Sequence, residues 1–434
     1  MTEHRKRPPL TLYFCFPTSL LAFILLLLLS CNGFRIFYIH VPFPAKTRPE
    51  PNSFSPETDQ TNDKETTQTW SSLSTSVMYS VKEELPHSNL NTQVSLFQKT
   101  QIFNSFSSKK PKSGRKLRRL SKILQPTISS KRFAVRTKKF LHGSSVNFSC
   151  KVRFFMTWIS SLDSFGYRET FSIESIFKSH PNACLLLVSN SMDTQRGIQL
   201  LKPFRDQGFR VSAISPDFRY LFKNTPAESW FLELKKGNID PGEVPFGQNL
   251  SNLLRLAILY RFGGIYLDTD VIVLRPLDHF RNIIGAQTMD LQSGNWSRLN
   301  NAVMIFDKKH PLVYKFIQEF TDTFNGNIWG HNGPYLVSRV VSGLGYTPGF
   351  NFTILPSLAF YPVNWNRVQS IFHAPTDAGH SKWMSRKLRQ IRENSFGVHL
   401  WNKESKRLKV GKGSILDRIM LDCCVFCNTS LSSL

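Results

Sequence analysis

The chain has 434 residues, of which 41% are hydrophobic, and its 55 Lys and Arg against 30 Asp and Glu give a formal net charge of +25. This length suits one large catalytic domain or two modest ones, and the 36 Phe and 8 Trp exclude a wholly disordered protein. Seven cysteines in so long a chain exclude a small disulfide scaffold.

The first apolar segment predicts a membrane anchor. Leu10–Cys31 contains no charged residue and is long enough to span a bilayer as a helix. Because the basic Arg5–Arg7 precedes it, we expect residues 1–9 to stay cytoplasmic and the rest of the chain to be lumenal. A cleaved signal peptide is the alternative, since Ser30, Cys31 and Gly33 are small residues at suitable cleavage positions.

Residues 32–149 are predicted to form a flexible lumenal stem, because they are rich in Ser, Thr, Asn, Gln and Pro and lack apolar periodicity. Within them, 109–139 holds 13 Lys and Arg and no acid. Such a run would suit nucleic-acid binding in a soluble protein. A lumenal stem never meets DNA, so we expect a solvated tether there, able to touch anionic headgroups or acidic glycans.

From residue 150 to 434 we predict one catalytic domain with an α/β fold. The expected strands are Val152–Ile159, Ala183–Ser189 and Arg210–Ile214, and the helices between them are Glu169–Ser179 and Gly197–Gln207. This alternation is typical of a mostly parallel sheet covered by helices.

A further predicted helix, Leu250–Phe262, stops at Gly263-Gly264 and is followed by a short strand, Ile265–Leu267. That strand delivers Asp268-Thr269-Asp270 at its carboxyl end, where ligands gather in open α/β sheets. In an extended segment alternate residues point the same way, so both carboxylates could face one pocket. A hard divalent cation would relieve their repulsion and could neutralise a departing diphosphate. By itself, D-x-D also fits two exposed turn carboxylates.

The surrounding sequence resembles the D-x-D glycosyltransferase family. Residues 251–274 read SNLLRLAILYRFGGIYLDTDVIVL, and 324–340 (FNGNIWGHNGPYLVSRV) are similar to the α-1,4-galactosyltransferase branch. FYPVNW at 360–365 and HLWNK at 399–403 follow in the expected order. The resemblance implies a GT-A (Rossmann-like) fold, with a D-x-D part at about 170–300 and a C-terminal part at about 310–425. It also implies a UDP-sugar donor, Mn²⁺ or Mg²⁺, and retention of the anomeric configuration.

The resemblance also implies roles for individual residues. The metal ligands would be Asp268, Asp270 and His399, although His399 could instead be a packing histidine beside Trp401. On the donor side it places Asn252, Arg255, Tyr266, Asp268 and Trp365. The catalytic set would be Asp268 and Asp270 with His331 and Asn332 lining the acceptor side.

One position departs from the family pattern. Many relatives have S-D-x-x-R where this chain has Ser251-Asn252, so an uncharged amide stands in place of a carboxylate. Arg255 keeps the guanidinium that suits phosphate and hydroxyl groups, with an exposed helix arginine as its alternative role. Trp329 and Trp365 could be stacking platforms for sugar rings or core residues.

The remaining cysteines and sequons agree with a lumenal fate. Cys150, Cys184, Cys423, Cys424 and Cys427 follow the stem. Cys424-x-x-Cys427 could be a redox or zinc pair, but structural disulfides are expected in an oxidising lumen, with the odd thiol free or paired between chains. Five N-x-S/T sequons occur, at Asn147, Asn249, Asn295, Asn351 and Asn428. Asn249 is a poor acceptor for glycosylation, because it lies beside the predicted active-site helix.

Together these features predict a Golgi type II membrane glycosyltransferase. It would move a hexose, galactose from UDP-galactose foremost, in α-linkage onto a glycan or glycolipid hydroxyl, with no nucleic-acid partner. A catalytically silent lumenal glycan-binding protein of the same fold is one alternative, suggested by Asn252. A soluble nucleic-acid-binding protein that uses residues 109–139 is the other.

Overall fold

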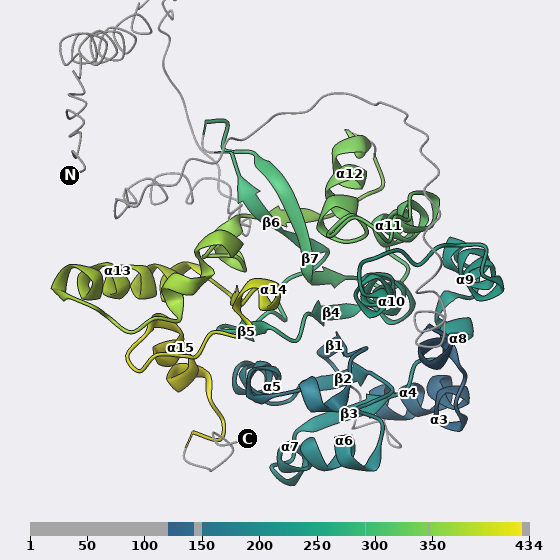
Figure 1. The fold of residues 1–434 in the computed structure, drawn as a ribbon, viewed down its shortest axis with the longest axis horizontal. Coiled ribbons are helices and arrows are strands. Elements are labelled where there is room, and N and C mark those ends of the chain that lie inside the picture. Colours follow the sequence, from purple (N-terminus) through teal and green to yellow (C-terminus); the bar gives the residue numbers. More distant parts are fainter. Residues whose placement is uncertain (1–119, 143–149, 291, 346–347, 428–434) are drawn as a thin grey trace, which may run out of the picture. The chain divides into compact units, whose positions relative to one another are not determined.

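The computed structural model describes residues 120–142, 150–290, 292–345 and 348–427 (Figure 1). Within these ranges, no helix combines the length and the apolar character needed to cross a bilayer. The predicted span Leu10–Cys31 and most of the predicted stem lie outside the described residues.

A seven-stranded sheet organises the domain, in the order β3-β2-β1-β4-β7-β6-β8. Its strands are β1 (Arg153–Thr157), β2 (Cys184–Val188), β3 (Arg210–Ile214), β4 (Gly264–Leu267), β6 (Ile283–Met289), β7 (Trp296–Phe306) and β8 (Thr353–Leu355). The pairs β1–β2, β2–β3, β1–β4 and β6–β8 are parallel, whereas β7 is antiparallel to both of its neighbours. The sheet is therefore mostly parallel, and the predicted α/β class is confirmed.

Helices cover both faces of this sheet. The helices of the described residues are α3 (Ile128–Lys131), α4 (Phe133–His142), η2 (Leu162–Ser164), α5 (Tyr167–Ser179), α6 (Gln195–Leu200), α7 (Lys202–Asp206), α8 (Phe218–Phe222), α9 (Pro226–Lys236), α10 (Phe246–Phe262), α11 (Pro311–Asp322), α12 (Pro334–Leu344), η3 (Ser357–Ala359), η4 (Trp365–Ile371), α13 (Ala378–Asn394), α14 (Asn402–Ser405) and α15 (Ile415–Cys423). Because strand side chains alternate, Phe154 packs into the core beneath α5 while its neighbour Phe155 packs into the core beneath α10. In Figure 1, α5 and α10 accordingly lie on opposite sides of the sheet.

The structure corrects one predicted helix and confirms the end of another. The predicted helix Gly197–Gln207 is divided at Leu201 into α6 and α7, because the bulky Pro203 at the second position of α7 cannot continue a helix from the preceding turn. The stop at Gly263 is confirmed: its φ is +64°, and a Cβ there would lie 2.5 Å from the backbone nitrogen of Lys308. The sharp turn at Gly263 lets β4 enter the sheet directly after α10.

The folded domain begins earlier than the predicted boundary at residue 150. Phe133 of α4 is fully buried, and Arg136 makes two hydrogen bonds to the Asp193 carboxylate, at 2.6 and 2.7 Å. The prediction of a solvated tether is thus wrong for 120–142. This part of the basic run is ordered because it buries apolar side chains and forms an ion pair with the rest of the domain.

The cysteines pair as Cys150–Cys184 and Cys424–Cys427, and Cys423 is a buried free thiol. The first bond ties the chain just before β1 to the first residue of β2. This confirms that four of the five form structural disulfides, and it accounts for the odd one.

His180 gives the domain a pH-dependent stability. Its ring is buried after α5, and Nε2 accepts a hydrogen bond of 2.8 Å from the Leu277 backbone N–H, which requires a neutral ring. Burial lowers the pKa of His180. Because the unfolded chain then binds the proton more readily, stability is present above the unfolded pKa of about 6.5 and falls as the pH drops below it, by up to about 1.4 kcal/mol per pH unit. We expect thermal unfolding between pH 7.5 and 5 to show this loss, and His180→Gln to reduce it. An identical pH profile in that variant would contradict the assignment.

Candidate metal and donor site

The D-x-D motif forms a turn at the carboxyl end of β4. The Val271 backbone N–H donates to the carbonyl oxygen of Asp268 at 3.2 Å, so Asp268-Thr269-Asp270 is not the extended segment that was predicted. The two carboxylates nevertheless reach one place. One ligand atom from each of Asp268, Asp270 and His399 lies within 4.8 Å of the others. The structure thus brings together all three predicted metal ligands.

A small second sheet explains how a residue 129 positions downstream reaches this turn. The strands β5 (Val271–Val273) and β9 (Gly397–His399) pair antiparallel, with His399 opposite Val271. His399 Nε2 then lies 3.3 Å from Asp270 Oδ1. Its ring also packs edge-on against Trp401, with 4.2 Å between ring centroids. His399 therefore packs against Trp401 and also faces the carboxylates, so its position is compatible with both of the roles considered from the sequence.

The chain after His399 closes around Asp270. The Leu400 backbone N–H donates to the Asp270 carbonyl at 2.8 Å, and the Asn402 N–H donates to Asp270 Oδ2 at 2.8 Å. Trp401 between them has a left-handed backbone, with φ of +54°. The sequence did not predict a role for Asn402, because it contacts Asp270 through its backbone N–H, which every residue except proline has.

Arg255 of α10 is a buried partner of the first carboxylate. Its guanidinium contacts Asp268 Oδ1 at 3.0 Å and Oδ2 at 3.2 Å, and donates to the Asn301 carbonyl at 2.7 Å. The Arg255 side chain is 2% exposed, so it is not an exposed helix arginine. Its central carbon also lies 4.7 Å from the centre of the Tyr266 ring. Arg255 thus fixes the orientation of Asp268 by a forked contact.

Hydroxyl groups complete the surroundings of Asp268. Tyr266 OH donates to Asp268 Oδ1 at 2.9 Å and lies 2.8 Å from the Thr157 hydroxyl, which in turn contacts Ser251. Burial raises the pKa of Tyr266, so it is a neutral donor at ordinary pH. Thr157 ends β1 and was not predicted, although its place at the carboxyl end of a parallel strand could have pointed to it.

The electrostatics of the two carboxylates differ. Burial raises the pKa of Asp268, the Arg255 charge opposes this, and the like charge of Asp270 adds to it, so the net shift is upward. Burial would also raise the pKa of Asp270, but the contacts with His399 and Asn402 N–H lower it overall. The site thus holds two carboxylates close together, one of which has a raised pKa, and an imidazole beside them. These groups are suitable ligands for a divalent cation. His399 Nδ1 is buried and lacks a hydrogen-bond partner among the described residues.

A group of buried amides lies next to this cluster. Asn252 accepts a hydrogen bond of 3.1 Å from Asn301, and Asn332 donates to Asn249 at 3.0 Å. A Cβ on Gly333 would lie 3.0 Å from Asn252 Oδ1, so glycine lets the 331–334 segment approach α10 closely. Asn252 of α10 and Asn332, which bonds Asn249 of the same helix, thus both belong to this group of buried amides, and the buried Asn249 is inaccessible as a sequon.

The other predicted residues are not joined to the carboxylates. His331 Nε2 lies 2.8 Å from the Thr323 carbonyl, and its own carbonyl accepts from Arg339. Trp365 and Trp329 are 46% and 42% exposed, which excludes the core alternative for both. Trp329 carries the Lys403 ammonium 4.6 Å above its ring.

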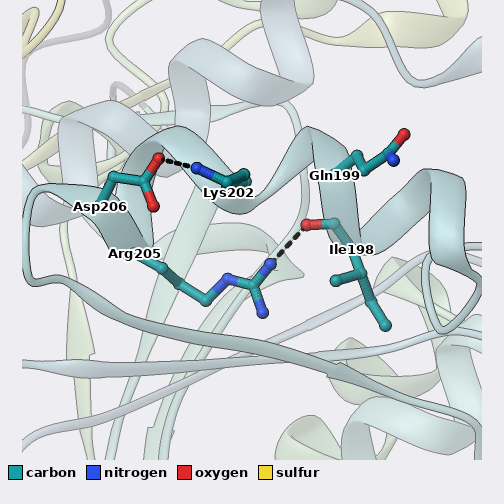
Figure 2. A pocket seen from close by; sticks show the side chains of 5 residues that line it. All are labelled: Ile198, Gln199, Lys202, Arg205 and Asp206. Carbon is teal, nitrogen blue, oxygen red and sulfur yellow. Dashed lines mark hydrogen bonds and ion pairs between the residues drawn. The ribbon is translucent and has the colours of Figure 1, made fainter.

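A separate surface pocket lies on α6 and α7 (Figure 2). Its five lining residues include Lys202, which pairs with Asp206, and Arg205, which donates to the Ile198 carbonyl at 2.6 Å. These groups satisfy one another, and none belongs to the metal cluster. The pocket therefore contributes nothing to the chemistry of the D-x-D turn.

Comparison with known proteins places these features in a family. The description "Glycosyltransferase sugar-binding region containing DXD motif" matches residues 166–290, and "Alpha 1,4-glycosyltransferase conserved region" matches 305–431. Lactosylceramide 4-alpha-galactosyltransferase of Pongo pygmaeus is 33% identical over 205 residues, which are 45% of this chain and 84% of that protein. The chain belongs to the α-1,4-glycosyltransferase family. The resemblance seen in the sequence blocks is thereby confirmed.

Other members of this α-1,4-glycosyltransferase family match a shorter share of their length. The human lactosylceramide 4-alpha-galactosyltransferase is 32% identical over 249 residues, 54% of this chain and 64% of that protein, so the chain spans just under two thirds of it. The human alpha-1,4-N-acetylglucosaminyltransferase is 25% identical over 215 residues, 47% of this chain and 56% of that protein.

Among solved structures, PaToxG glycosyltransferase is 15% identical with a TM-score of 0.34, covering 65% of this chain and 99% of that one. Galactosyltransferase LgtC in complex with donor and acceptor sugar analogs is 14% identical with a TM-score of 0.32, covering 57% and 86%.

Proposed function

We propose that the chain is a metal-dependent hexosyltransferase that uses a UDP-sugar as donor. The observation that carries this proposal is the meeting of Asp268, Asp270 and His399 at the carboxyl end of β4, with the buried Arg255 behind Asp268. Mn²⁺ or Mg²⁺ held by these three side chains would neutralise the charge of the departing diphosphate.

The chain's own residues supply positioning and electrostatics. Arg255 and Tyr266 OH hold Asp268 in one orientation, and their hydrogen bonds favour its ionised form against the effect of burial. The Asn402 N–H and His399 do the same for Asp270. A pair of carboxylates held in fixed orientations in this way needs little rearrangement to receive a cation, which is the advantage of a preorganised site.

Asn252 and Asn332 would face the sugar side. Both are buried amides that donate and accept hydrogen bonds without carrying charge, which suits hydroxyl groups of a hexose. We place His331 toward the acceptor and keep the exposed Trp365 on the donor side. In a retaining reaction on one face, the acceptor hydroxyl bonds to the anomeric carbon as the bond to the diphosphate oxygen breaks, and its proton leaves with that diphosphate. Such a step depends mainly on positioning.

Galactose is our first choice of donor sugar and a glycan or glycolipid our choice of acceptor, in α-linkage, because relatives at 32–33% identity are named 4-alpha-galactosyltransferases of lactosylceramide. The 25% identical N-acetylglucosaminyltransferase makes that sugar the second choice. The strand order with an antiparallel β7 supports a GT-A arrangement. We further propose a type II Golgi protein anchored by Leu10–Cys31, on the basis of the sequence alone.

A donor screen tests this function. The full chain is incubated with Mn²⁺ and UDP-galactose, UDP-glucose, UDP-N-acetylglucosamine or UDP-N-acetylgalactosamine, and released UDP is measured. We expect release with one of them well above the others, and transfer with retained configuration once an acceptor is supplied. No release with any donor from folded protein would overturn the proposal and favour the silent glycan-binding alternative.

A further inference from the structure

The ligands of the metal cluster are held together by a sheet of only two short strands. Asp270 directly precedes β5 and His399 ends β9, so the pairing of these strands sets the distance between the two ligands. A two-stranded sheet is marginally stable in water unless another element packs on it. The helix α5 packs against β5 (Figure 1) and supplies none of the three ligands. The geometry of the cluster therefore depends on how α5 holds this small sheet.

Three polar side chains of α5 are buried at intervals of three residues. They are Glu169, which is 9% exposed, and Ser172 and Ser175, which are fully buried. Residues three apart are neighbours on the surface of a helix, so these groups follow one another along α5. A buried polar group without a partner destabilises a fold, and each of the three accordingly needs a specific partner on a neighbouring segment.

The two serines bond the edge of β5 that faces away from β9. The Asp270 carbonyl faces the β9 side, where it accepts from the chain after His399, and backbone groups alternate in direction along a strand. On the other edge, Ser172 Oγ donates to the Val271 carbonyl at 2.6 Å. The Val273 N–H donates to Ser175 Oγ at 2.9 Å. The serine hydroxyls thus take the place that a third strand would have beside β5.

Glu169 connects the same helix to the segment after His399. Its Oε1 accepts a hydrogen bond of 3.3 Å from the Asn402 side-chain amide, and its Oε2 accepts one of 2.9 Å from the Gly166 N–H at the start of α5. Asn402 begins α14, and its backbone N–H bonds Asp270 Oδ2 at 2.8 Å. Hydrogen bonds from α5 therefore reach the segments that follow both Asp270 and His399.

We propose that Glu169, Ser172 and Ser175 are positioning residues that set the affinity of the cluster for a divalent cation. They supply no ligand atom to the cluster, and they hold β5 and α14 against one helix so that Asp270 and His399 face each other before a cation binds. Removing a group that orients metal ligands typically costs about 10–100-fold in metal affinity or activity. The inference rests on the proposed metal-dependent function and extends its site to a helix without ligands.

The test is Mn²⁺ binding to the full chain, measured by calorimetry. Ser172→Ala/Ser175→Ala removes both hydroxyls from the edge of β5, and we expect it to weaken Mn²⁺ binding about tenfold or more. Ser130→Ala/Ser414→Ala is the matched control, because it also removes two buried serine hydroxyls, which bond backbone N–H groups at the starts of α3 and α15. Both double variants should lower the midpoint of thermal unfolding, but the control should keep wild-type affinity for Mn²⁺.

Glu169→Gln tests the connection to α14 separately. Glutamine has one acceptor oxygen instead of two, so it can serve the Gly166 N–H or the Asn402 amide but not both. We expect a smaller loss of Mn²⁺ affinity than in the double serine variant. If that double variant does not fold, Glu169→Gln decides the question.

Wild-type Mn²⁺ affinity in the folded serine variant would overturn the inference, as would equal weakening in the control or no Mn²⁺ binding by the wild-type chain. UDP release from UDP-sugars, measured on the same samples, keeps this inference apart from the proposed function. A set of proteins that bind Mn²⁺ in the expected order but release no UDP would contradict the transferase function and support the role of α5.

Discussion

Asp270→Asn is expected to abolish sugar transfer while leaving the fold intact. The amide keeps an oxygen that can accept the Asn402 N–H, which now bonds Asp270 Oδ2 at 2.8 Å, but it removes the charge that a divalent cation needs. Losing one of three ligands should cost several kcal/mol of transition-state stabilisation, or about a thousandfold in rate. UDP release and Mn²⁺ binding by calorimetry should fall together.

Asp163→Asn is the matched control for this variant. Asp163 lies in η2 and pairs with Arg196 at 2.8 Å, and its side chain is 70% exposed. The same chemical change there should leave UDP release and Mn²⁺ binding close to wild type. Near-normal turnover of Asp270→Asn would refute its role as a metal ligand.

Arg255→Ala is expected to reduce both stability and activity. The guanidinium is 2% exposed and contacts both oxygens of Asp268 as well as the Asn301 carbonyl. Its removal leaves a crowded carboxylate without its cation, a change that typically costs about 3–5 kcal/mol at buried pairs. The pKa of Asp268, already raised by burial, should rise further and weaken cation binding. Urea unfolding and UDP release measure the two effects.

Arg255→Lys distinguishes the effect of the positive charge from the effect of the two-pronged guanidinium contact with Asp268. Lysine keeps one positive charge but cannot contact both carboxylate oxygens and the Asn301 carbonyl in the same geometry, so we expect intermediate stability and activity. Arg261→Ala, on the same helix, is the control, because Arg261 donates to the backbone carbonyl of Lys223 and packs on Tyr220, and it has no carboxylate partner among the described residues. Wild-type stability and turnover in Arg255→Ala would show that the buried pair is dispensable.

Local patterns predicted the first half of the domain well. The buried strands β1, β2 and β3 are short apolar runs between helices with clear spacing, and the glycine pair after α10 marks a sharp turn. The side of the sheet beyond β4 was not predicted. The strand β7 contains the polar Asn300 and Asn301, whose amides are satisfied by Gln287 and Asn252 from distant segments. Such tertiary pairing has no local signature.

The site shows the same division. Asp268, Asp270 and His399 were found because their residue types carry the chemistry, and pairing of β5 with β9 then brings them together. Asn402 acts through its backbone, and Thr157 through its place at the end of β1. The helix α4 lies in a stretch whose overall composition predicted a tether, and the burial of Phe133 within it depends on contacts with distant segments. Roles that depend on position rather than side-chain type stay hidden in one sequence.

The central claim is that Asp268, Asp270 and His399 hold a cation on which UDP-sugar cleavage depends. Its most direct test is UDP release by the full wild-type chain after treatment with EDTA, followed by Mn²⁺ titration. We predict that release from the preferred UDP-sugar is lost on chelation and restored by Mn²⁺ in a saturable manner. UDP release that continues unchanged in EDTA would contradict the account.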